Sequence, residues 1–102
     1  MSIAIIIQAH MSSKRLPGKV MIKYKNYNLL SLLLKRLKNV ANIKKIIIAT
    51  TKNPRDDKIV NFCKKNKILF YRGSENDVLS RYYETAKKFR IKTIQMKLEN
   101  VF

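Results

Sequence analysis

Cysteine, glycine, proline and acidic residues are all scarce in this chain. Its 102 residues include one cysteine, one histidine, two glycines, two prolines and no tryptophan. A single cysteine excludes an internal disulfide framework, and a single histidine excludes a zinc site of the cysteine–histidine type. We interpret Cys63 as a buried structural thiol in a reducing cytoplasm, because its neighbours are apolar at helical spacing and no histidine stands in its motif to activate it.

Long apolar runs are also missing. The run from Ile3 to Ile7 is too short to span a membrane, and no small-residue cleavage site of a signal peptide follows it. We therefore expect a cytoplasmic protein that does not interact with membranes. Hydrophobic residues make up 46% of the chain, which is enough for a core, and the length predicts one domain or part of one.

Only six residues are acidic, against 23 lysines and arginines, so the formal net charge is +17. Such a charge makes nucleic acid, nucleotides and anionic surfaces plausible partners. The basic residues are spread along the whole chain rather than gathered in one block, which is typical of lysines on solvated helix faces. We favour a generally basic surface over a dedicated nucleic-acid patch.

Strand-like and helix-like segments alternate along the chain. Unbroken runs of β-branched residues predict strands that are buried on both faces, and such strands belong to parallel sheets with right-handed crossovers. We expect an α/β doubly wound, Rossmann-like sheet, in which four strands at most suggest the amino-terminal half of a larger domain. The strands are predicted at 3–8, 46–50 and 68–70, with a fourth beginning within 91–96.

Helix starts are marked by capping residues. Asn28 can cap a leucine-rich helix that runs to about Val40. Asn53-Pro54 can begin a second helix, and Asp56 and Asp57 favour the positive end of its dipole. Ser74 followed by Asp77 fits a capping box for a third. The predicted sheet-facing residues of this third helix are Val78, Leu79, Tyr82, Tyr83, Ala86 and Phe89, and we interpret the tyrosine pair as core rather than as a stacking platform for bases.

The segment from Gln8 to Lys19, with the sequence QAHMSSKRLPGK, follows the first predicted strand. It carries three fixed cations, two hydroxyl groups and a Pro17-Gly18 turn, and it belongs to a connection that is long for a compact domain. A polycationic loop at the carboxyl end of a buried parallel strand lies where open α/β sheets bind anionic ligands. These features indicate a phosphate-binding loop, with a solvated basic connection as the alternative.

The known phosphate-loop patterns are absent. Neither GxxxxGK[ST] nor GxGxxG follows the first strand, so kinase-like and dinucleotide-binding interpretations lose their main support. The segment QAHMSSKRLPGKV instead resembles the signature of the cytidylyltransferases that activate sugar acids and related sugars. The likeness is greatest to the spore coat polysaccharide and glycosyltransferase-like cytidylyltransferases, and more distant to those that act on 3-deoxy-manno-octulosonate and acylneuraminate.

Two further segments extend the resemblance. The sequence ATTKNPRDD at 49–57 is similar to the family's second strand-to-helix junction, and RGSENDVLSRYY at 72–83 is similar to the segment after its third strand. The three segments occur in the family's order and spacing over about residues 3–92. The chain is therefore identified as a member of this family, with residues 1–102 as a partial, CTP-binding nucleotidyltransferase domain.

The resemblance implies nucleotidyl transfer. A sugar hydroxyl attacks the α-phosphorus of CTP, a CMP-sugar forms and pyrophosphate leaves, with Mg²⁺ assisting. Lys14, Arg15 and Lys19 would then be the catalytic cations, because fixed positive charge stabilises the departing pyrophosphate. Ser13 and the loop amides would donate hydrogen bonds to phosphate oxygens.

The remaining positions implied for nucleotide binding lie at strand ends. Gln8 and Ala9 correspond to the place where the family's backbone meets cytosine. Arg72, Ser74 and Asp77 follow the third strand on the ligand side of the sheet. For Ser74 and Asp77 a ligand contact and a helix cap both stay open, and for Arg72 the alternative is a surface arginine.

Two departures from the family pattern lower the expected activity. His10 stands where the family has arginine, so a permanent bidentate phosphate donor is replaced by a group that is mostly neutral near pH 7. A Gly-Asp-x-Pro motif whose aspartate helps to hold the metal is absent, and Glu99 does not match its spacing. We expect a truncated member that is weakly active or inactive alone and shows no metal ligand.

Two other hypotheses remain. The charge of +17 would also suit a basic module that binds nucleic acid or another anion without catalysis. The open edges expected of half a sheet would suit a homo-oligomer, or a subunit completed by another chain.

Overall fold

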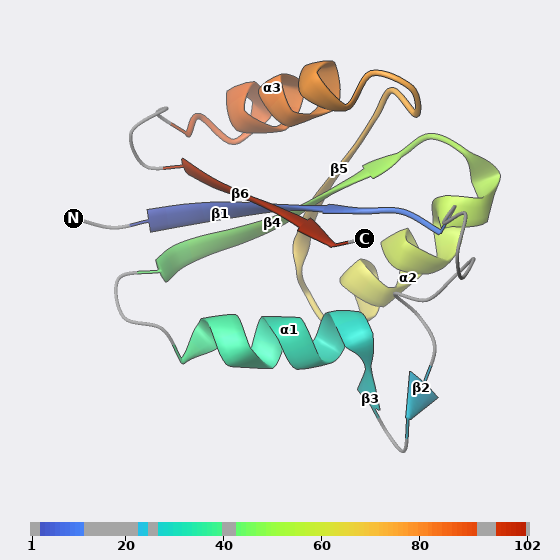
Figure 1. The fold of residues 1–102 in the computed structure, drawn as a ribbon, viewed down its shortest axis with the longest axis vertical. Helices are drawn as coiled ribbons and strands as arrows, with labels where there is room; N and C mark the ends of the chain where they lie inside the picture. The colour runs from blue at the N-terminus through green and yellow to red at the C-terminus, as the bar shows by residue number, and fades with distance from the viewer. Residues whose placement is uncertain (1–2, 12–22, 25–26, 40–42, 92–95, 102) are drawn as a thin grey trace.

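The structure, a computed structural model, describes residues 3–11, 23–24, 27–39, 43–91 and 96–101. Its main feature is a four-stranded sheet in the order β5-β4-β1-β6, in which every neighbouring pair is parallel (Figure 1). This arrangement confirms the predicted parallel α/β fold. The strands are β1 (Ile3–Ala9), β4 (Ile43–Thr51), β5 (Leu69–Gly73) and β6 (Met96–Val101).

Helices cover both faces of the sheet. Helices α1 (Leu29–Lys38) and α2 (Asp57–Lys65) lie on one face, and α3 (Val78–Lys88) lies on the other (Figure 1). The chain runs outward from β1 through β4 to β5 and then returns over the opposite face to place β6 on the other side of β1. The sheet is therefore doubly wound, and its topological switch point lies between β1 and β6, where such folds bind ligands at the carboxyl ends of the strands.

The core has one layer on each side of the sheet. On the α1 and α2 face, alternate residues of β1 pack with Ile48 and with apolar residues of both helices, namely Leu30, Leu34, Ile59 and Cys63. On the α3 face, Ile6 and Ala49 pack against Ala86. Cys63 is fully buried, and burial raises the pKa of its thiol to about 12. This placement confirms the structural interpretation of Cys63, because a buried neutral thiol is a poor nucleophile.

Two of the three predicted helix starts are confirmed. The Asn28 side chain accepts a hydrogen bond from the Ser31 amide at 2.7 Å, and the Ser31 hydroxyl accepts one from the Asn28 amide at 3.0 Å, forming a capping box for α1. Asn53 caps a short 3₁₀ turn, η2 (Pro54–Asp56), which leads directly into α2. Helix α1 ends at Lys38, two residues before the predicted end, and Val40 lies outside the described residues.

The predicted start of α3 is wrong. Asp77, not Ser74, is its N-cap: the Asp77 carboxylate accepts a hydrogen bond from the Ser80 amide at 2.9 Å. Ser74 lies one step earlier, and its hydroxyl accepts from the Asp77 amide at 3.1 Å. The two polar side chains therefore accept hydrogen bonds from successive parts of the turn, Ser74 from the Asp77 amide and Asp77 from the Ser80 amide.

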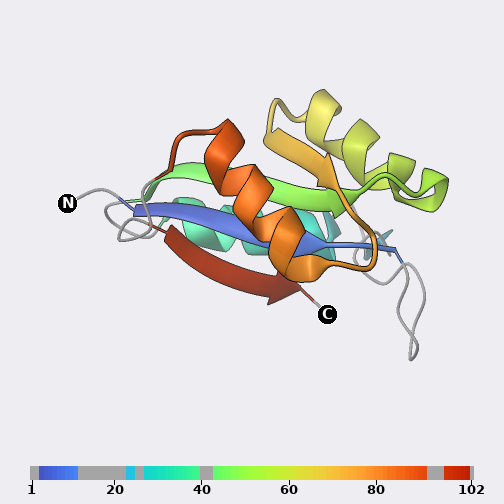
Figure 2. The same cartoon turned by 90° about the horizontal axis from the view of Figure 1, so that it is seen from above.

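The predicted buried face of α3 is also partly wrong. Val78, Leu79 and Tyr83 are exposed, whereas Arg81, Thr85 and Ala86 are buried. The helix is turned toward β5, where Glu84 accepts a hydrogen bond from the Tyr71 hydroxyl. Figure 2 shows α3 crossing the face of the sheet, with β6 at the sheet's edge.

Several element boundaries also differ from prediction. Strand β4 begins at Ile43 rather than at residue 46, and β5 extends to Gly73 rather than ending at residue 70. The fourth strand begins at Met96, the last residue of the predicted range 91–96. No sequence pattern predicts the small antiparallel hairpin of β2 (Lys23–Tyr24) and β3 (Tyr27–Asn28) that precedes α1. Among the described residues, no helix has the length and apolar character that crossing a membrane requires.

Candidate nucleotide-binding site

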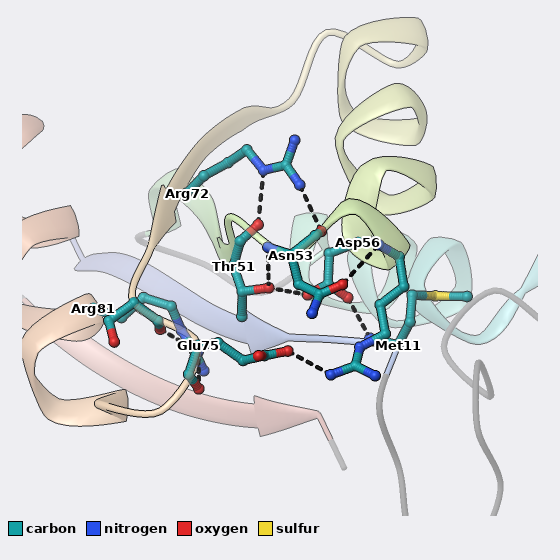
Figure 3. Close-up of polar contacts among 9 residues, drawn as sticks. Met11, Thr51, Asn53, Asp56, Arg72, Glu75 and Arg81 are labelled. Carbon is teal, nitrogen blue, oxygen red and sulfur yellow. Dashed lines mark hydrogen bonds and ion pairs between the residues drawn. The ribbon is translucent and has the colours of Figure 1, made fainter.

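Polar side chains tie together the carboxyl ends of β1, β4 and β5. These ends are the edge of the sheet from which the Gln8–Lys19 segment departs, and their contacts are drawn in Figure 3. The predicted site residues Gln8, Ala9, His10, Arg72, Ser74 and Asp77 are all described and lie at this edge. Ser13, Lys14, Arg15 and Lys19 lie outside the described residues, so their placement stays a prediction.

Gln8 joins β1 to α3. Its side chain is 1% exposed; its carbonyl oxygen accepts from Arg81 Nε at 2.6 Å, and its amide donates to the Val78 carbonyl at 3.3 Å. Ala9 is fully buried in the core on the α1 and α2 face. Both side chains are therefore engaged within the protein, which leaves backbone atoms as the groups that these two residues can offer to a ligand. His10, directly after the strand, is half-buried.

Arg72 is held against the turn after β4. Its guanidinium donates to the Thr51 carbonyl at 2.7 Å and to the Asn53 carbonyl at 3.0 Å, and it forms an ion pair with Asp57 at 2.8 Å. The side chain remains 26% exposed. Arg72 therefore stabilises the β4–η2 turn while keeping part of its guanidinium at the surface of this edge.

Arg81 occupies the interior of the same edge and is 2% exposed. Besides its bond to Gln8, it donates to the Ser74 carbonyl at 3.0 Å and to the Glu75 carbonyl at 3.5 Å. Burial lowers the pKa of its guanidinium, an effect opposed by the negative charges of Asp56 and Glu75. Arginine nevertheless stays protonated near neutral pH, so a fixed positive charge lies beneath the ends of β1 and β5.

Asp56 is the second buried charge at this edge, 1% exposed. One carboxylate oxygen accepts a hydrogen bond from the Met11 amide at 2.7 Å, and the other accepts one from the Thr51 hydroxyl. The Thr51 hydroxyl in turn accepts from the Asn53 amide at 3.1 Å. This arrangement connects the end of β1 to the turn after β4 (Figure 3).

Sequence reasoning does not select Thr51, Asp56 or Arg81 as site residues. All three stand inside the segments that carry the family resemblance, and the sequence presents Asp56 only as a favourable charge at a helix start. One sequence feature could have identified Asp56. A helix start needs one capping group, whereas this segment supplies Asn53, Asp56 and Asp57 together. For Arg81 the signal is a charged residue next to an otherwise apolar helical stripe.

A magnesium site is not formed by the described residues. No group of three or more histidine, cysteine, aspartate or glutamate side chains that could hold a metal gathers among them. Both oxygens of the buried Asp56 carboxylate already accept hydrogen bonds. These residues do not fit the Mg²⁺ that the family resemblance implies.

The doubly wound sheet, with a polar network at its carboxyl edge, defines an α/β domain of the Rossmann-like class. Comparison with known proteins narrows this class. The family model described as cytidylyltransferase matches residues 4–101. The chain belongs to the cytidylyltransferase family, which confirms the resemblance found in its sequence segments.

Curated relatives include an uncharacterized protein of Methanocaldococcus jannaschii, 44% identical over 87 residues. The spore coat polysaccharide biosynthesis protein SpsF of Bacillus subtilis is 37% identical over 89 residues. The matches cover 85% and 83% of this chain but only 36% and 37% of the two relatives. The chain thus spans little more than a third of the length of either relative.

Solved structures agree on the fold. A cytidylyltransferase from Leptospira borgpetersenii matches 98% of this chain and 41% of its own, with a TM-score of 0.87 and 35% identity. A CMP:2-keto-3-deoxy-manno-octonic acid synthetase, solved in complex with CTP, matches 85% of this chain and 36% of its own, with a TM-score of 0.66 and 24% identity.

Proposed function

We propose that this chain binds CTP at the carboxyl edge of its sheet and forms the nucleotide-binding half of a sugar-activating cytidylyltransferase. The observation that carries the proposal is the QAHMSSKRLPGK segment, which leaves the central strand β1 beside the topological switch point. Membership of the cytidylyltransferase family supports cytidine as the base. The likeness to SpsF supports a role in surface polysaccharide biosynthesis. We propose the cytoplasm as the location of this role.

The proposed chemistry is the attack of a sugar hydroxyl oxygen on the α-phosphorus of CTP. The hydroxyl gives up its proton to water, the new bond joins its oxygen to phosphorus, and the bond from the α-phosphorus to the pyrophosphate oxygen breaks. Lys14, Arg15 and Lys19 stabilise the negative charge that gathers on the leaving pyrophosphate. The chain alone is proposed to have little or no turnover, because its described residues do not form a magnesium site.

Binding of CTP is expected to raise the melting temperature of the purified chain in a saturable way. A ligand that binds only the folded state stabilises it in proportion to the logarithm of its concentration over Kd. The measurement is a thermal-shift titration with CTP, ATP and a random oligonucleotide, each with Mg²⁺ at near-physiological salt. The proposal predicts a shift that is selective for CTP.

The rival hypothesis is a basic module for nucleic acid, motivated by the charge of +17. It predicts a shift with the oligonucleotide that weakens steeply with salt and shows no preference between CTP and ATP. That outcome would contradict the proposed CTP binding, since a site built for cytidine must distinguish CTP from ATP.

The exposed apolar side of α3 supports the proposal of a homo-oligomer or a completing chain. Leu79 and Tyr83 are one helical turn apart and are 76% and 63% exposed. We expect the purified chain to self-associate or to bind a hydrophobic dye through this surface, and the double variant Leu79→Glu/Tyr83→Glu to abolish both. Light scattering measures the association. A wild-type chain that is strictly monomeric, unfolds cooperatively and binds no dye would contradict this expectation.

A further inference from the structure

The carboxylate of Asp56 does not do what its position in the chain suggests. Asp56 is the N-cap residue of α2, where an aspartate ordinarily accepts a hydrogen bond from an amide of its own helix. Its side chain makes no such capping bond. It reaches instead to the Met11 amide, 45 residues away in sequence, at 2.7 Å.

This orientation calls for an explanation because a buried carboxylate is costly. Transfer of a charge away from water is unfavourable unless hydrogen bonds compensate for it. Asp56 is 1% exposed, and its compensating donors are the Met11 amide and the Thr51 hydroxyl. One of these two donors is the backbone just beyond the end of β1.

The platform that holds Asp56 is itself fixed. Thr51 accepts a hydrogen bond from the Asn53 amide through its hydroxyl, and Arg72 donates to the carbonyls of both residues (Figure 3). Arg72 of β5 therefore holds the turn after β4 in place. Asp56, which belongs to this turn, holds the Met11 amide through its hydrogen bond.

Met11 is where the connection with the predicted phosphate-binding cations begins. Lys14 follows it by three residues, and Arg15 and Lys19 come next. We propose that Asp56 is a positioning residue for nucleotide binding, which fixes the backbone at Met11 without touching the nucleotide itself. The inference rests on the proposed function for its ligand, CTP.

The test compares variants of the full chain by isothermal titration with CTP. Asp56→Ala removes the bond to Met11 and is expected to weaken CTP binding about tenfold, since a hydrogen bond to a charged group contributes on this scale. Asp56→Asn keeps an acceptor oxygen for the Met11 amide and is expected to restore most of the affinity. Glu84→Ala removes a carboxylate that accepts a hydrogen bond from the Tyr71 hydroxyl, changes the net charge equally and is expected to bind CTP like wild type.

A second readout is hydrogen exchange of the Met11 amide, followed by NMR without nucleotide. The amide is expected to be protected in wild type and Asp56→Asn and to exchange faster in Asp56→Ala. If Asp56→Ala loses its cooperative melt, Asp56→Ser replaces it. Serine is a good N-cap for α2 but is too short to reach Met11, so the same loss of affinity is expected.

The outcomes separate the two proposals. If wild type binds CTP but the folded Asp56→Ala or Asp56→Ser variant binds it equally well, the positioning role is wrong. Equal Met11 exchange in all variants also overturns it. If wild type does not bind CTP, the proposed function fails, and the exchange data alone decide whether Asp56 anchors the end of β1.

Discussion

Replacing Arg81 with alanine is expected to lower the free energy of unfolding by about 3 kcal/mol. The guanidinium is buried and donates to Gln8 at 2.6 Å and to the Ser74 carbonyl at 3.0 Å. Alanine would leave these acceptors without donors and would vacate the space against Gly73, where the approach is so close that a Cβ on the glycine would lie 2.9 Å from Arg81 Cγ. The expected loss of stability has two sources: buried acceptors left without hydrogen-bond donors, and a cavity where the arginine side chain was.

Urea unfolding followed by circular dichroism measures this effect, and Arg55→Ala is the matched control. This control also removes one positive charge. The ion pair that it breaks, between Arg55 and Glu75 at 2.5 Å, is exposed, with 52% of the arginine side chain accessible. Exposed pairs contribute less than about 1 kcal/mol. If both variants unfold at the same urea concentration, Arg81 does not hold this edge of the sheet together.

The double variant Lys14→Ala/Arg15→Ala is expected to weaken CTP binding about 100-fold. Each cation is proposed to make a charge-assisted hydrogen bond to phosphate worth about 1.5–3 kcal/mol, and 1.4 kcal/mol corresponds to a tenfold change in Kd. Isothermal titration with CTP measures the effect. The melting temperature is expected to change little, because the two side chains are proposed to contact the ligand rather than the core.

The control for this variant is Lys64→Ala/Lys65→Ala, at the carboxyl end of α2. Both lysines are exposed, and their loss lowers the net charge by the same two units. A protein that merely attracts anions would lose affinity equally in the two double variants. Such an equal loss would remove Lys14 and Arg15 from the proposed catalytic and nucleotide-binding set.

Local chemistry made much of the fold predictable from the sequence. Runs such as Ile3–Ile7, with no polar alternation, can only be buried on both faces, and this property requires a parallel sheet covered by helices. The caps at Asn28 and Asn53 were also predictable, because a capping side chain bonds to amides two or three residues away. The motif segments led to the cytidylyltransferase family without any knowledge of the structure.

Tertiary structure alone decided the roles of Asp56, Arg81 and the turn before α3. The sequence predicts that Asp56 serves its own helix, but its carboxylate bonds to Met11, and Arg81 bonds to Gln8 from 73 residues away. The face of α3 is turned because Arg81 enters the interior, which leaves Leu79 and Tyr83 exposed. Sequence patterns report interactions between near neighbours, whereas these side chains are satisfied by partners that only the folded sheet brings within hydrogen-bonding distance.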